Sequence, residues 1–318
     1  MELVHLLMNL VAAPVALTFL FIVLPLLFIG RFISSLIRSL SSENMSGKVV
    51  LITGASSGIG EHLAYEYAKR GAFLVLVARR EKMLVEVAKK AGQLGSPDVF
   101  VIRADVSQAD ECKRFVQETV RRFGRLDHLV CNAGIVSFGK FENVLGFSNL
   151  KSVMDINFWG SIYPTYFAIP HLRKSKGKIV VNASGTSWLI SPFFSFYGAS
   201  KAAIVNFYET MRIELAPEIK ITIAAPWYTE SEMVSHGKSL TKDGVVENSR
   251  EMREVLIGKL PVMRVGVCAK DIVNGACSGE RYVIEPFCYK ILFLLQFFYP
   301  GIVEWAARRL YMGKSGTT

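Results

Sequence analysis

The sequence predicts one α/β domain built on a doubly wound parallel sheet, preceded by an apolar N-terminal membrane anchor. Two observations predict it. Short β-branched runs alternate with helical stretches over residues 47–286, and residues 3–29 contain no Lys, Arg, Asp or Glu. Strands that alternate with helices at this interval indicate parallel βαβ units. We therefore divide the chain into an anchor (1–30), a linker (31–46), a main domain (47–286) and an amphipathic, apolar C-terminal segment (287–318).

The net charge of +10 identifies no partner by itself. Lys and Arg are scattered, without the basic stripe or the motif that nucleic-acid binding requires, so we expect no nucleic-acid partner. Two small basic groups flank apolar segments, which suits contact with anionic lipid head groups: Arg31 with Arg38, and Arg308 with Arg309. Most of the remaining excess charge is interpreted as a solvated basic surface.

The five cysteines are Cys112, Cys131, Cys268, Cys277 and Cys288. An odd count without metal-type spacing indicates neither a disulfide framework nor a zinc site. We therefore expect no metal, and a reducing environment around the main domain.

The apolar run at residues 3–29 is long enough for a helix that crosses the hydrocarbon core, which takes about 20 residues. It lacks the basic n-region and the clean cleavage site of a signal peptide. Pro14 and Pro25 each remove a backbone donor and kink a helix, so a membrane span and a proline-kinked hairpin both stay open. Because Arg31 and Arg38 follow the run, the positive-inside tendency places the main domain in the cytosol.

The first predicted strand of the main domain, 48–52, runs directly into a glycine-rich turn and then a helical stretch. Glycines in such a turn let the backbone approach a pyrophosphate, and the helix N-terminus supplies N–H donors. Strand, turn and helix in this order are stronger evidence than the glycines alone. We predict that the dinucleotide-binding residues here are Gly54, Ser56, Ser57, Gly58, Ile59 and Gly60.

The second predicted strand, 73–78, ends in Arg79 and Arg80. NAD-preferring proteins usually place an acidic residue here, which binds the ribose 2′-hydroxyl. This chain lacks that carboxylate and has two guanidinium groups suited to a 2′-phosphate. The alternative, that both arginines are simply solvated, is less favoured, because cations at a helix N-terminus are mildly unfavourable. We therefore predict NADP(H) rather than NAD(H).

Three further predicted strands run into candidate ligand-binding residues at their ends. Residues 99–103 lead to Asp105 and Val106, residues 127–131 to Asn132, Ala133 and Gly134, and residues 178–181 to Ser184. In a doubly wound sheet, ligands bind beyond the carboxyl ends of the strands. We expect these residues and the glycine turn to form one site.

The ordered series of motifs from TGASSGIG to Tyr197-x-x-x-Lys201 resembles that of the short-chain dehydrogenases/reductases. The resemblance includes Asp105-Val106 and Cys131–Gly134 and covers roughly residues 47–286. It implies a Rossmann-type fold and NADP(H)-linked oxidoreduction. Within that family, the apolar N-terminus with two prolines and the segment Asn157–Ser161 resemble plant 11β-hydroxysteroid dehydrogenase-like proteins, the steroleosins of oil bodies.

The spacing of Tyr197 and Lys201 suits proton transfer. Residues four apart share a helix face, so the ammonium of Lys201 can lie near the phenol. A free phenol has a pKa of about 10, and a nearby cation lowers that pKa. By resemblance, Tyr197 exchanges the proton, Lys201 also holds the cofactor ribose, Ser184 binds the substrate oxygen, and Asn157 anchors a water in the proton relay.

A second Tyr-x-x-x-Lys pattern, Tyr65 to Lys69, lies on the helix after the glycine turn. We expect its tyrosine to pack in the core or face solvent. Only Tyr197 has a serine thirteen residues upstream at a strand end, as the family pattern requires. We therefore assign the acid/base role to Tyr197.

One departure from the family pattern follows the predicted strand 221–225. The family usually has Pro-Gly there, and this chain has Pro226-Trp227. Glycine lets the backbone pass close to the nicotinamide because it has no side chain. The indole of Trp227 either reshapes the substrate pocket or weakens cofactor binding, and both outcomes stay open.

Apolar residues before Tyr197 are candidates for the wall of a substrate pocket: Trp188, Leu189, Ile190, Pro192, Phe193, Phe194 and Phe196. Such a wall suits a steroid or a similar lipophilic alcohol or ketone. Core packing alone explains part of the set equally well. By resemblance, residues 228–263 form a mobile lid over the substrate.

The C-terminal run at residues 287–312 is interpreted as an interfacial or dimer-forming helical segment, because charged residues interrupt it. Burial in the core is the alternative. The resemblance implies residence on the endoplasmic reticulum or lipid droplets, and homodimers are the habit of the family. A protein of another class, a lipid-droplet coat with lost catalysis, is the alternative to an enzyme.

Overall fold

The computed structural model describes residues 42–143, 147–230, 238–240, 246–248, 262–286 and 289–312, and separate positions between residues 7 and 30. The chain forms two compact units, Met1–Glu43 and Asn44–Thr318. The described positions between residues 7 and 30 are helical, with a π-helical turn at Phe19–Val23 (η1), and their large apolar side chains are exposed. Among all the residues that are described, no helix is both long and apolar enough to span a membrane. Of the predicted linker, residues 31–46, the part at 31–41 lies outside the described residues.

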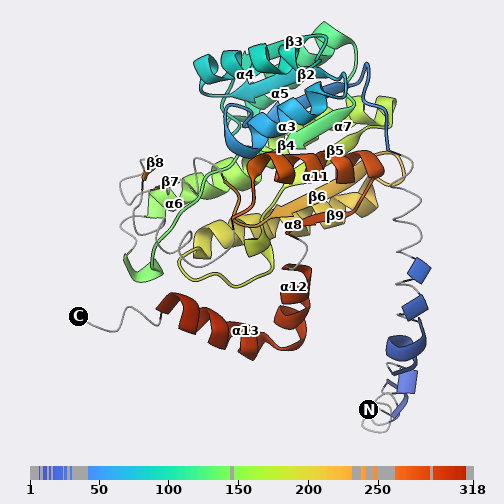
Figure 1. The fold of residues 1–318 in the computed structure, drawn as a ribbon, viewed down its shortest axis with the longest axis vertical. Helices are drawn as coiled ribbons and strands as arrows, with labels where there is room; N and C mark the ends of the chain where they lie inside the picture. Colours follow the sequence, from blue (N-terminus) through green and yellow to red (C-terminus); the bar gives the residue numbers. More distant parts are fainter. Residues whose placement is uncertain are drawn as a thin grey trace. The chain divides into compact units, whose positions relative to one another are not determined.

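The described strands of the second unit include a seven-stranded sheet in the order β3-β2-β1-β4-β5-β6-β9, with every neighbouring pair parallel (Figure 1). The strands are β1 (Val49–Thr53), β2 (Phe73–Ala78), β3 (Val99–Arg103), β4 (His128–Cys131), β5 (Lys178–Asn182), β6 (Lys220–Pro226) and β9 (Tyr282–Glu285). The strand order reverses between β1 and β4. Ligands bind at such a switch point in doubly wound sheets, so the topology places the site at the ends of these two strands.

Helices cover both faces of the sheet (Figure 1). They are α3 (Gly58–Ala68), α4 (Glu81–Gln93), α5 (Ala109–Phe123), α7 (Gly160–Ser175), α8 (Ser195–Glu214) and α11 (Val265–Ser278), whereas α6 (Phe147–Met154) packs against α8. Alternate residues of a strand point to opposite faces: Val50 and Ile52 pack with α3, α4 and α11, whereas Val49 and Leu51 pack with α5, α7 and α8. Burial on both faces explains why the strands are continuous apolar runs.

The predicted Rossmann-type doubly wound α/β fold is confirmed for this second unit. The strands predicted at 73–78 and 99–103 are β2 and β3 with the same bounds, and the strand predicted at 48–52 is β1, displaced by one residue. The last strand of the sheet, β9, and the helix before it, α11, had no sequence prediction. The fold therefore contains one more βαβ unit than the motifs indicate.

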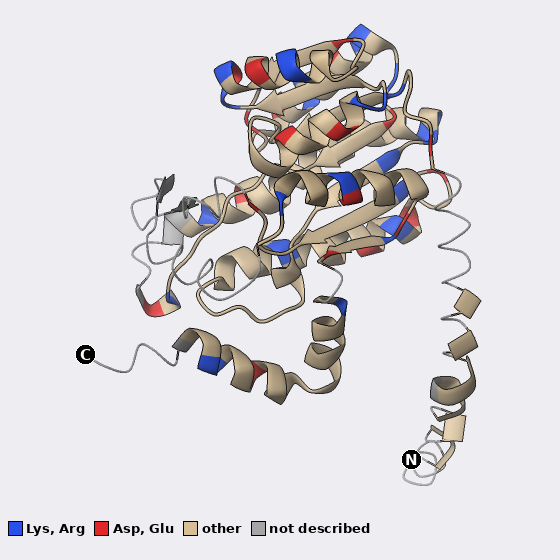
Figure 2. Cartoon of the chain, in the orientation of Figure 1, with Lys and Arg blue, Asp and Glu red and all other residues tan. Residues whose placement is uncertain are grey.

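After β9 the chain forms α12 (Tyr289–Phe298), α13 (Pro300–Ala307) and a π-helical turn at Arg308–Met312 (η5). Figure 2 shows that these helices carry few charged residues. Many of their apolar side chains are exposed, including Phe297 at 79% and Trp305 at 60%. Burial of this segment in the core is therefore excluded for most of its apolar residues.

Most of the predicted lid, residues 228–263, lies outside the described residues. Its described parts include the antiparallel pair β7 (Lys238–Leu240) and β8 (Val246–Asn248). A parallel bridge between Thr229 and Met263 joins the two ends of the segment. Both ends of the segment are thus fixed beside β6.

Candidate active site

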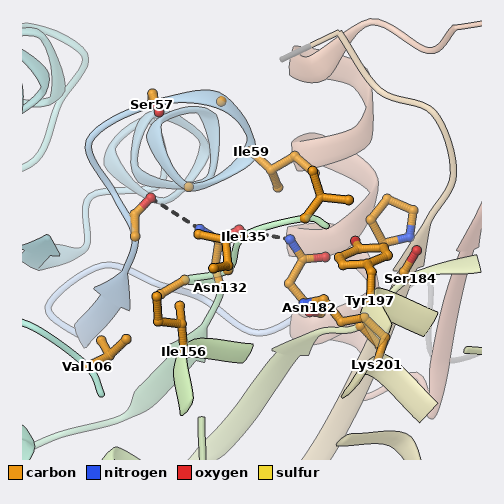
Figure 3. A pocket seen from close by; sticks show the side chains of 18 of the residues that line it. Ser57, Ile59, Val106, Asn132, Ile135, Ile156, Asn182, Ser184, Tyr197 and Lys201 are labelled. Atoms are coloured by element: carbon orange, nitrogen blue, oxygen red, sulfur yellow. Dashed lines mark hydrogen bonds between the residues drawn. The ribbon is translucent and has the colours of Figure 1, made fainter. Parts of the chain in front are cut away.

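A cavity of about 480 Å³ lies at the carboxyl ends of the strands (Figure 3). Its wall contains every predicted cofactor-binding residue and the three predicted catalytic residues Ser184, Tyr197 and Lys201. Figure 3 shows Ser57, Ile59 and Asn132 on one side of the pocket, and Ser184, Tyr197 and Lys201 on the other. The topology therefore brings together segments that are more than one hundred residues apart in sequence.

Glycines let the turn pack closely on itself and on the segment after β4, where a side chain would not fit. Gly54 has φ +66°, and a Cβ there would lie 2.7 Å from the Cα of Ala133. A Cβ on Gly60 would lie 2.3 Å from the carbonyl oxygen of Gly54. The turn leads directly into α3, whose N-terminal residues line the cavity. The first N–H groups of a helix have no partner within the helix, so they are available to bind a ligand. This is the arrangement that holds a pyrophosphate.

Asn132 links three segments of this wall by hydrogen bonds. Its Nδ2 donates to the carbonyl oxygens of Thr53 (3.0 Å) and Gly54 (3.2 Å), and Nδ2 of Asn182 donates to its Oδ1 (2.8 Å). The Oγ1 of Thr53 accepts from the backbone N–H groups of Asn132 and Ala133. Asn132 thus fixes the position of the glycine turn and also lines the cavity, and its contact with the cofactor stays a prediction.

Arg79 and Arg80 lie at the end of β2, as predicted, and contact different parts of the wall. Arg79 lies 3.9 Å from the carboxylate of Asp105 in an ion pair. Arg80 donates to Ser56 Oγ at 3.1 Å and to Ser57 Oγ at 2.5 Å. The guanidinium of Arg80 is thus held against the glycine turn, although it stands at the start of α4, where a cation is unfavourable.

Ser184 is oriented by Thr186, which had no sequence prediction. Ser184 begins a short 3-10 turn, Gly185–Ser187 (η4). The backbone N–H and the Oγ1 of Thr186 both donate to Ser184 Oγ, at 3.2 and 3.0 Å. A hydroxyl oxygen accepts at two lone pairs, so the Ser184 hydroxyl is left to donate its own hydrogen. It forms a hydrogen bond with Tyr197.

Burial decides the pKa values of Tyr197 and Lys201. It raises the pKa of the Tyr197 phenol, and the hydrogen bond with Ser184 acts in the opposite direction. It lowers the pKa of the Lys201 ammonium to about 8. The ammonium donates to the carbonyl oxygen of Asn182 at 2.8 Å and lies 5.9 Å from the centre of the Tyr197 ring. The expected lowering of the Tyr197 pKa by Lys201 is thus not seen in the protein alone, because desolvation dominates for both groups.

Asn157 does not belong to the described wall of the cavity, and its side chain is fully buried in the π-helical turn Asp155–Trp159 (η3). Its Oδ1 accepts from the backbone N–H of Ile135, and its Nδ2 donates to the carbonyl oxygen of Ile135 and to Ser200 Oγ. The amide therefore fixes the segment after β4 rather than reaching a ligand. A role in a water relay stays a prediction.

The substrate side differs from the sequence prediction. Among the seven apolar residues proposed as its wall, only Phe194 lines the described cavity; Leu189 is buried in the domain, and Trp188 packs against Phe293 of α12. Tyr228, which had no such prediction, also lines it, and so does Trp227, whose effect on the pocket the sequence left open. The loop before α8 contains Phe193 with φ +72°, a conformation rare for a bulky residue.

The wall fits a dinucleotide. Its glycine turn accepts phosphate, and its other end combines a hydroxyl, a phenol and an ammonium. Between the two ends, the Oδ1 of Asn182 is buried and has no hydrogen-bond partner within the described part of the chain. A buried polar atom without a partner indicates a ligand or water at that point.

The second copy of the Tyr-x-x-x-Lys pattern is structural. Tyr65 lies in the core, 5% exposed, and its hydroxyl donates to Glu61. Lys69 pairs with Glu66 on the surface. Of the two alternatives expected for this tyrosine, packing in the core and facing solvent, the structure shows packing.

The chain belongs to the short-chain dehydrogenase family, whose model matches residues 48–240. It is 49% identical over 316 residues to 11-beta-hydroxysteroid dehydrogenase A of Sesamum indicum, covering 99% of this chain and 90% of that protein. Identity and both coverages are the same for 11-beta-hydroxysteroid dehydrogenase 1A of Arabidopsis thaliana. A crystal structure of a short-chain type dehydrogenase/reductase from Mycobacterium marinum is 27% identical, with a TM-score of 0.66, covering 77% of this chain and 96% of that one. The resemblance seen in the motifs is thus confirmed.

Proposed function

We propose that the protein interconverts a hydroxyl group and a ketone on a steroid or a similar lipophilic substrate, with NADP(H) as cofactor. The observation that carries the proposal is the grouping of Ser184, Tyr197 and Lys201 at one end of a cavity whose other end is a glycine turn. The names of the plant relatives, at 49% identity, support the substrate class. Arg79 and Arg80 beside the turn support NADP(H).

When bound, the nicotinamide supplies or takes up a hydride at the substrate carbon. The residues of this chain bind the substrate oxygen and exchange its proton. In the direction of reduction, Tyr197 donates its proton to the ketone oxygen, and the Ser184 hydroxyl donates a hydrogen bond to the same oxygen. Lys201 places positive charge close to the phenol that loses its proton, which stabilises the phenolate. Oxidation runs through the same groups in reverse.

Steady-state assays of the detergent-purified full chain test this proposal. NADPH and NADH are offered with a panel of steroid ketones, retinoids and long-chain ketones, and the oxidised cofactors with the matching alcohols. We expect turnover that favours NADP(H) and falls by about 10²–10⁴-fold in Tyr197→Phe. Unchanged turnover in Tyr197→Phe, with NADPH bound equally by both proteins, would contradict the assignment.

We also propose that residues 1–30 anchor the protein to the endoplasmic reticulum or to lipid droplets, with the second unit in the cytosol. Exposed apolar side chains on the described positions of the first unit and on α12 and α13 support it. In microsomes, the full chain should resist extraction by alkaline carbonate, and added protease should digest the second unit. A glycan at the acceptor Asn44 would place the domain in the lumen instead.

A coat protein of lipid droplets is the second candidate, favoured by the exposed apolar residues of α12 and α13. It predicts tight association with droplets and no turnover on any member of the substrate panel. The enzyme assay therefore separates the two candidates. Homodimerisation stays a prediction.

A further inference from the structure

Trp227 lies against the backbone of Gly185, the residue that follows Ser184. A Cβ atom on Gly185 would lie 1.9 Å from Cε3 and 2.5 Å from Cζ3 of the indole. Such distances exclude any side chain at residue 185 while the ring stays in place. Gly185 and Trp227 are therefore a matched pair, and the ring supports the turn that carries Ser184.

Tyr289, the first residue of α12, contacts the indole of Trp227. Its ring is stacked on the indole of Trp227, with centroids 4.7 Å apart and planes at 28°. The backbone N–H of Trp227 donates to the carbonyl oxygen of Glu285 at 3.0 Å. The indole N–H is buried and has no hydrogen-bond partner in the described residues. Stacking, rather than a hydrogen bond of the side chain, thus orients the ring.

Two more contacts join the C-terminal helices to the substrate side. The ring centroids of Trp188 and Phe293 are 5.3 Å apart, and the hydroxyl oxygens of Tyr228 and Tyr311 are 3.4 Å apart. Tyr228 and Trp227 both line the cavity. The position of α12 is therefore coupled to the wall of the cavity beside Ser184 and Tyr197.

We propose that Trp227, held in place by Tyr289, determines substrate specificity by giving the cavity a flat aromatic wall beside Ser184. A flat face stacks well on a rigid ring system. A rigid ligand also loses less conformational freedom on binding than a flexible chain does. The wall therefore selects fused-ring ketones and alcohols over linear ones. This inference rests on the proposed function and names the selecting residue.

The test compares Trp227→Ala and Tyr289→Ala with the conservative variants Trp227→Phe and Tyr289→Phe. The probes are a tetracyclic ketosteroid and a linear ketone with the same number of carbon atoms. Dissociation constants are measured with NADP⁺ bound, and kcat and KM with NADPH. In both alanine variants we expect the Kd and KM of the steroid to rise about tenfold. We expect the linear ketone and NADPH to change less than about twofold, and the phenylalanine variants to keep most of the selectivity.

Three results would overturn the proposal: an equal loss for both ketones, a loss of NADPH binding, or a wild-type protein that binds neither ketone. Failure of the proposed function is a different result. Suppose that the wild-type protein binds the steroid more tightly through Trp227 and yet reduces neither ketone. That result would refute the proposed enzymatic activity and would leave the role of Trp227 in specificity intact.

The matched pair has its own test. Gly185→Ala should weaken steroid binding strongly in the wild-type background, because its Cβ meets the indole. In the Trp227→Ala background the same substitution should have a much smaller effect. Equal effects in both backgrounds would show that the two residues do not interact.

Discussion

The hydroxyl group of Ser184 owes its direction to Thr186, which donates to Ser184 Oγ from both its backbone and its side chain. Thr186→Val removes the second bond and lets the serine hydroxyl rotate away from the substrate oxygen. We expect kcat to fall about fivefold, the equivalent of about 1 kcal/mol, with KM unchanged. Thr186→Ser keeps the donor and should restore kcat. Equal kinetics in all three proteins would show that the bond has no catalytic role.

The buried ammonium of Lys201 links stability to pH. Its pKa falls from 10.5 to about 8 on folding, so between these values the unfolded chain holds a proton that the folded chain has lost. The unfolding free energy therefore rises with pH in this window; the contribution is fully present above about pH 10.5 and is lost as the pH falls to about 8. Wild type should gain up to about 3 kcal/mol relative to Lys201→Met across the window. Denaturant unfolding of both proteins measures it, and parallel curves would contradict it.

At the scale of elements, the proposed preference for NADP(H) depends on the turn from β2 into α4. Arg80 stands at the start of α4 and reaches back to Ser56 and Ser57 on the glycine turn. Arg80→Ala should raise the Kd of NADPH by roughly 10–100-fold, because a charge-assisted bond to the 2′-phosphate is lost. The Kd of NADH should change less than about threefold. Lys82→Ala, which removes the same charge from the exposed face of α4, is the matched control; equal effects of both substitutions would mean a general charge effect.

The elements that the sequence predicted best are those with the strongest local signal. Strand β2 is an apolar run buried on both faces, β3 is a mostly apolar run at the edge of the sheet, and the glycine turn has a fixed order of residues. All three can therefore be predicted from sequence without tertiary information. The contacts of Thr186 and Asn182 were missed because they depend on turn geometry, although both residues lie close to Ser184 in sequence. The inward amide of Asn157 depends on a π-helical turn that no residue pattern predicts.

The substrate wall was predicted least well, for a physical reason. Hydrophobicity predicts burial, but it does not tell which side of a loop faces a cavity and which faces the core. In the loop before α8, Phe194 lines the cavity and the other predicted wall residues do not, and Phe193 has left-handed backbone, which hydrophobicity does not predict. Trp227 was recognised as a departure from the family pattern, whereas its contact with Gly185 needs the folded chain.

At the scale of the whole molecule, the second unit combines a cavity suited to a dinucleotide with C-terminal helices whose apolar residues remain exposed. The central claim is that this cavity transfers hydrogen between cofactor and substrate, with Tyr197 as the acid. A coat protein with the same fold would bind the cofactor without any transfer.

A single-turnover experiment tests this claim most directly. The full-length, detergent-purified protein is mixed with NADPH deuterated at the transferable position of the nicotinamide and with a ketosteroid, and the product is analysed by mass spectrometry. We predict an alcohol that carries one deuterium at the carbinol carbon, formed about 10²–10⁴-fold more slowly in Tyr197→Phe despite equal NADPH binding. A wild-type protein that binds both ligands and yields no deuterated alcohol would contradict the account.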